Sequence, residues 1–83
     1  FKKIYRGINQ MNVFLNNVDD VTEFVNAASK SPNEINLESG CVFIDGKSFL
    51  GVLTMGIKRR MMVKIVGTDI EFANRIKKFA IAV

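Results

Sequence analysis

The chain contains no histidine and no tryptophan, and it has a single cysteine and a single proline. Without histidine, and with Cys41 as its one thiol, it lacks the ligand sets with which proteins usually hold zinc. It also lacks the residue that most often serves as a general base, and it has no glycine-rich phosphate loop. We therefore expect no metal site, no cofactor and no enzymatic activity. The lone cysteine cannot form an internal disulfide.

Long hydrophobic runs are missing as well. Apolar runs such as 42–44 and 61–63 are far shorter than the roughly 20 residues that span a bilayer, and no signal-peptide pattern begins the chain. With 48% hydrophobic and 24% charged residues, the composition is that of a packed globular chain. A chain of 83 residues has room for one core. We expect one soluble, cytoplasmic domain spanning residues 1–83.

Positive charge is in excess but dispersed. Twelve Lys and Arg against eight Asp and Glu give a net charge of +4, and adjacent cations occur only at 2–3, 58–60 and 77–78. Lys77 and Lys78 would stabilise the carboxyl end of a helix, so their charge does not require a bound ligand. A nucleic-acid footprint would gather on one face together with stacking aromatics. Nucleic-acid binding is therefore a lesser alternative that the sequence does not favour.

Alternation and helical spacing predict the first half of the domain. Residues 11–15 alternate as a strand, with Met11, Val13 and Leu15 on one face. Asn17 then precedes a helix whose apolar stripe (Val18, Val21, Val25 and Ala28, with Phe24 beside it) ends before Pro32. Residues 35–38 and 41–44 form an antiparallel hairpin around a Ser39–Gly40 turn. Because Cys41 lies in an apolar run, we expect its thiol to be buried.

The second half predicts a short helix, a strand and a long helix. Ser48 caps a helix that Gly56 ends after about two turns, and a strand over 61–66 follows. The sequence from Thr68 to Glu71 has the spacing of a capping box, with the threonine as the cap. The last helix should run to the C-terminus and turn its apolar side chains inward (Phe72, Ile76, Phe79 and Val83).

The predicted order is strand, helix, strand, strand, helix, strand, helix. Three helices on one face of a mainly antiparallel sheet of four strands would bury their apolar stripes in two layers. We therefore expect an α+β fold.

Three stretches resemble one protein family. Residues 25–30 (VNAASK), 35–38 (INLE) and above all 45–57 (DGKSFLGVLTMGI) resemble the histidine-containing phosphocarrier protein, HPr, of the bacterial sugar phosphotransferase system. The resemblance covers roughly residues 8–80 and implies the HPr-like open-faced β-sandwich, with the same order of elements. Residues 1–7 lie before it and are a candidate N-terminal extension.

The resemblance also identifies an active site that this chain has lost. The family's phosphorylated histidine falls on Asn17, the arginine two residues on falls on Asp19, and the following proline falls on Asp20. Two carboxylates at a helix start cap it well but repel a phosphoryl group. We interpret the three residues as a helix start. An acidic recognition spot is an alternative, whereas acid–base catalysis would need a partner that the sequence does not offer.

The short helix carries the family's other functional positions. The regulatory serine falls on Ser48, which helix capping alone would also explain, and Asp19 in place of the family's arginine would oppose its phosphorylation. The docking positions carry Phe49, Leu50 and Leu53, which we expect to form a partly exposed apolar patch rather than core.

These residues predict a function in protein binding. The resemblance implies a non-catalytic HPr-like paralogue that acts as an interaction or regulatory module, in the phosphotransferase system or in carbon-catabolite regulation. Its partners would bind the helix from Ser48 to Leu53, and the same patch could instead close a homodimer. The alternatives are a phosphocarrier-type component of the phosphotransferase system and, more remotely, a basic nucleic-acid-binding domain.

Overall fold

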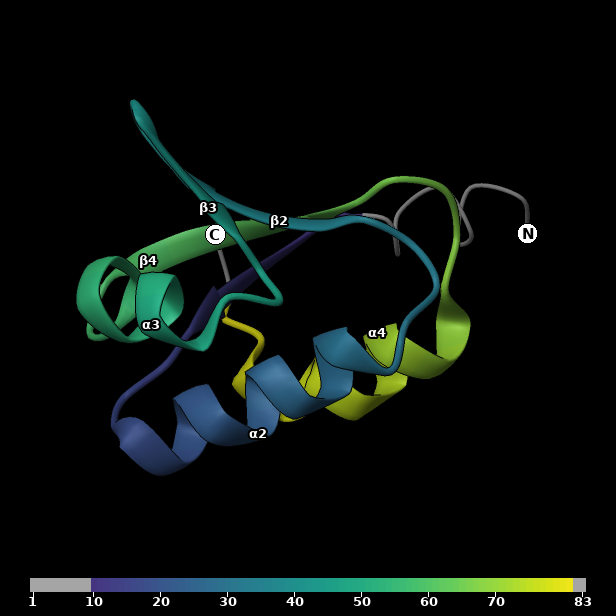
Figure 1. Ribbon diagram of the computed structural model, residues 1–83, viewed down its shortest axis with the longest axis horizontal. Helices are drawn as coiled ribbons and strands as arrows, with labels where there is room; N and C mark the ends of the chain where they lie inside the picture. Colours follow the sequence, from purple (N-terminus) through teal and green to yellow (C-terminus); the bar gives the residue numbers. More distant parts are fainter. Residues whose placement is uncertain (1–9, 82–83) are drawn as a thin grey trace.

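The computed structural model describes residues 10–81, which form a four-stranded sheet and three helices (Figure 1). The strands are β1 (Gln10–Phe14), β2 (Ile35–Ser39), β3 (Val42–Asp45) and β4 (Arg60–Ile65). The helices are α2 (Val18–Ser29), α3 (Phe49–Gly51) and α4 (Ile70–Ile76). A π-helical turn, η1 (Val52–Gly56), continues α3, and a 3₁₀ turn, η2 (Lys77–Phe79), continues α4. The predicted α+β class and the order of elements are confirmed.

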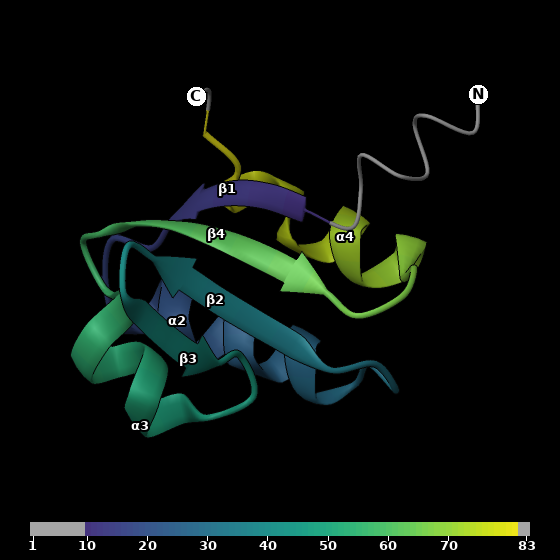
Figure 2. The ribbon, with the colours of Figure 1, turned by 90° about the horizontal axis from the view of Figure 1, so that it is seen from above.

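The sheet is antiparallel throughout and open, with the strand order β1-β4-β2-β3 (Figure 2). The hairpin of β2 and β3 pairs Leu37 with Ile44, and β4 lies between β2 and β1. β1 and β3 are therefore the edge strands. Beyond the helices, the chain returns to the edge of β1, where the N–H of Ile81 donates to the carbonyl of Asn12 at 2.9 Å.

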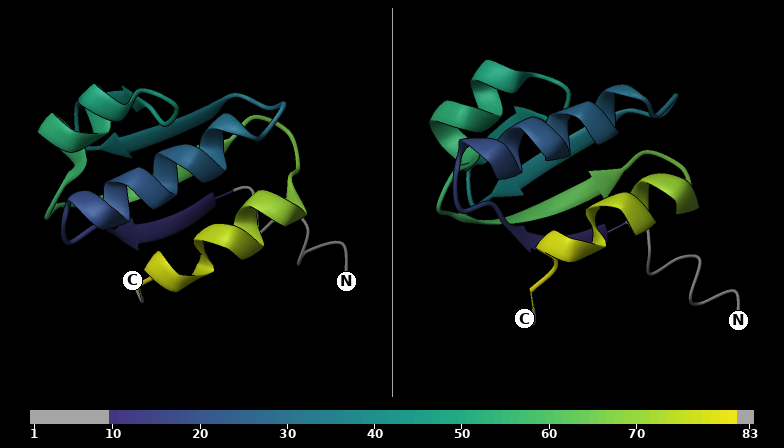
Figure 3. Two further views of the ribbon diagram at one scale, coloured as in Figure 1. Left: turned by 60° about the horizontal axis from the view of Figure 1, so that its bottom comes forward. Right: turned by 90° about the horizontal axis from the view of Figure 1, so that it is seen from below.

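All three helices lie on one face of the sheet, with α2 between α3 and α4 (Figure 3). The strands alternate, so that Val13, Leu37 and Val63 point toward the helices and are almost fully buried. Between α2 and α4, the rings of Phe24 and Phe72 meet edge to face with centroids 5.8 Å apart. The opposite face of the sheet is not covered by any helix among residues 10–81.

Two details of the helices correct the sequence predictions. Val18, expected in the apolar stripe of α2, is 51% exposed; it is the first residue of the helix and so lies at the end of the stripe. The last helix ends with η2 rather than continuing, since Ala80 is extended and pairs with Val13. Phe72, Ile76 and Phe79 are buried as predicted. Val83 and the candidate extension 1–7 lie outside the described residues.

The prediction that Cys41 is buried is wrong: the residue is exposed. The β2–β3 turn consists of Gly40 and Cys41 rather than Ser39 and Gly40, because Ser39 already pairs with Val42. Gly40 adopts a φ of +61° at the first central position of this two-residue turn, where type II′ hairpins favour glycine. Cys41 follows at the tip, where its side chain meets solvent.

The predicted cap of α4 is also shifted by one residue. Asp69, and not Thr68, is the N-cap, and its carboxylate accepts the N–H of Phe72 at 2.9 Å. Its second oxygen accepts the hydroxyl of buried Ser31 at 2.5 Å, at the end of α2. Aspartate can serve both helices at once, which explains why it displaces the threonine. Among residues 10–81, no helix has the length and apolar character needed to cross a membrane.

Candidate functional site

The segment from Ser48 to Gly56 exposes three large apolar side chains. Ser48 caps α3 by accepting the N–H of Gly51 at 3.2 Å. Beyond this cap, Phe49 is 41% exposed, Leu50 is 68% exposed and Met55 is 44% exposed. We call these three residues the docking patch. Leu53, the third residue expected on this surface, is half-buried and packs against the core.

The chain holds this segment close to the sheet through small residues. A Cβ atom on Gly51 would lie 3.2 Å from Cγ2 of Ile44, so α3 sits directly over β3. The hydroxyl of Thr54 donates to the carbonyl of Leu50 at 2.9 Å. This bond gives the carbonyl a side-chain partner where the helix becomes irregular. Fully buried Val52 anchors the centre of the segment. The exposed apolar residues are therefore carried by a segment that packs against the sheet.

The π-helical turn explains why Met55 was not predicted as part of the patch. In an α-helix, residues 50 and 55 would lie about 140° apart around the axis. The i→i+5 bonding of η1 widens the turn and reduces that angle, leaving both Leu50 and Met55 exposed. No sequence signal for the π turn is evident, because the segment also has helical spacing. Such turns often occur at functional sites.

Positive charge surrounds the docking patch in sequence. Between Asp45 and Asp69 the chain has no acidic residue but five cations, namely Lys47, Lys58, Arg59, Arg60 and Lys64. The ammonium of Lys47 donates to the carbonyl of Ser31 at 2.8 Å and is thereby directed toward the end of α2. The three cations at 58–60 directly follow η1 and are exposed. Arg60 and Lys64, by contrast, lie on the face of the sheet that points away from the helices.

The start of α2 is closed by its own side chains. The side-chain oxygen of Asn17 accepts the N–H of Asp20 at 2.9 Å, and the carboxylate of Asp20 accepts the N–H of Asn16 at 2.9 Å. Asp19 is exposed in the same turn. Two backbone donors that could hold a phosphoryl group are thus already paired. α2 packs against both α3 and η1, so this helix start and the docking patch belong to neighbouring elements (Figure 3).

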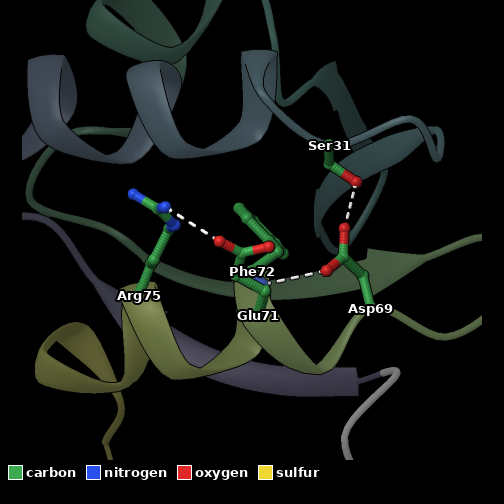
Figure 4. Close-up of polar contacts among 5 residues, drawn as sticks. All are labelled: Ser31, Asp69, Glu71, Phe72 and Arg75. Atoms are coloured by element: carbon green, nitrogen blue, oxygen red, sulfur yellow. Dashed lines mark hydrogen bonds and ion pairs between the residues drawn. The ribbon is translucent and has the colours of Figure 1, made fainter.

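A second set of polar contacts joins α2 to α4 (Figure 4). Asp69 links Ser31 to the N–H of Phe72, and Arg75 pairs with Glu71 at 3.0 Å. Sequence analysis did not single out this cluster. A hollow of about 190 Å³ lies beside it, but its carboxylates all have partners within the protein. We interpret these contacts as ties between the two helices rather than as a reactive site.

Within residues 10–81, no group of three histidine, cysteine or acidic side chains is arranged to hold a metal ion. Comparison with models of known protein families gave no match, and neither did comparison with curated proteins.

Proposed function

We propose that the protein is a non-catalytic HPr-like module that binds a protein partner through the docking patch. The observation that carries this proposal is the exposure of Phe49, Leu50 and Met55 within the short segment that α3 and η1 form over β3. Exposed apolar side chains that gather on a protein surface often mark an interface. Lys58 and Arg59, which are exposed directly after η1 and Ile57, favour a partner with acidic groups.

The fold supports the HPr-like part of the proposal. The element order, the open antiparallel sheet of four strands and the three helices on one face are what the resemblance of residues 45–57 implies. Folds host many functions, so this agreement bears on the scaffold and not on the activity.

The start of α2 supports a role without phosphoryl transfer. Asn17 stands where the family's histidine would be, and its amide cannot accept a phosphoryl group for onward transfer. Asp20 occupies the N–H of Asn16 and adds a negative charge. The alternative of a working phosphocarrier would need another acceptor.

Ser48 is the residue through which the module could be regulated. Its side chain is half-buried and accepts the N–H of Gly51, and its neighbour is Phe49 of the docking patch. A phosphate there would add roughly two negative charges at the border of the patch. Incubation with the family's serine kinase and ATP, followed by mass spectrometry, tests this regulation. An unmodified Ser48 would limit the proposal to unregulated binding.

Calorimetry with the general phosphotransferase enzyme of the same organism tests the docking proposal. Leu50→Lys should weaken binding at least tenfold, because the substituted side chain would bury a charge in an apolar contact. Val66→Lys is the matched control, since Val66 is also exposed but lies after β4. Equal affinities for the wild type and both variants would contradict the patch.

Absence of binding would remove this enzyme as the partner. Sedimentation of the protein alone then tests the alternative that it forms a homodimer. A dimer that Leu50→Lys dissociates and Val66→Lys does not would identify a second copy as the occupant of the docking patch.

A further inference from the structure

We draw no further inference here: the strongest candidate, the sheet face opposite the helices with exposed Phe43 on its edge strand β3, carries as many carboxylates as cations, and nothing among residues 10–81 shows what covers it.

Discussion

Asn17 and Asp20 cap the start of α2 together: the side-chain oxygen of Asn17 accepts the N–H of Asp20, while the carboxylate of Asp20 accepts the N–H of Asn16. This arrangement satisfies two donors that a helix start otherwise presents to an anion. It also places a negative charge at the end of the helix where a phosphoryl group would need a positive one. Restoring a histidine alone would therefore not restore the environment of a phosphohistidine.

Asn17→His should yield a folded protein that accepts no phosphoryl group from phosphoenolpyruvate and the general enzyme. The loss of the asparagine cap should lower the free energy of unfolding by about 1 kcal/mol. The triple variant Asn17→His, Asp19→Arg, Asp20→Pro removes both carboxylates and should accept the group. Mass spectrometry of the products measures both outcomes. Phosphorylation of the single variant would show that the carboxylates do not oppose the chemistry.

Asp69→Ala should be strongly destabilising. It removes the cap of α4 and leaves the buried hydroxyl of Ser31 without its acceptor, which together should lower the free energy of unfolding by roughly 2–3 kcal/mol. Thr68→Ala is the matched control and should change it by less than about 0.5 kcal/mol. Urea unfolding measures both. A larger effect of Thr68→Ala would show that Thr68 is the N-cap of α4, as the sequence predicted.

Gly46 has no room for a side chain. A Cβ atom there would lie 2.8 Å from Cγ2 of Ile35 and 3.0 Å from its carbonyl oxygen, to which the N–H of Gly46 also donates. Gly46→Ala should lower the free energy of unfolding by about 1–3 kcal/mol. Gly56→Ala, whose closest contact would be an ordinary 3.4 Å, should be much milder. Similar midpoints of thermal unfolding for both variants would contradict this packing.

Cys41 should react with a thiol reagent in the native protein. Its place at the tip of the β2–β3 hairpin exposes the thiol, so a colorimetric disulfide reagent should label it at a rate close to that of the unfolded chain. Labelling that requires denaturant would show that the thiol is buried, as the apolar run around it suggests.

The sheet and the first helix could be predicted from sequence because their signals are local. Alternation gave the inward residues of β1 and β4, such as Val13 and Val63, and asparagine marked the start of α2. Cys41 was misplaced because the alternation of a strand does not show which residues form a two-residue turn. Thr68 was preferred to Asp69 because the contact with Ser31, 38 residues away in sequence, is visible only in the fold.

The candidate surfaces were less predictable than the elements that carry them. Leu50 and Phe49 could be identified as patch residues only through a family resemblance, and Met55 joins them through a π turn that helical spacing does not indicate. Phe14 and Phe43 lie far apart in sequence and share the sheet face opposite the helices only because β1 and β3 flank one sheet. A surface assembled from several elements leaves no continuous pattern in the chain.

The most direct test of the central claim is to incubate the protein with phosphoenolpyruvate and the general phosphotransferase enzyme, and to measure its intact mass. A genuine HPr from the same organism serves as the positive control. If the scaffold persists without phosphoryl transfer, the mass of the control rises by one phosphoryl group and the mass of this protein stays unchanged. A phosphoryl group gained by this protein would contradict the account, because it would mean that a chain without histidine still acts as a carrier.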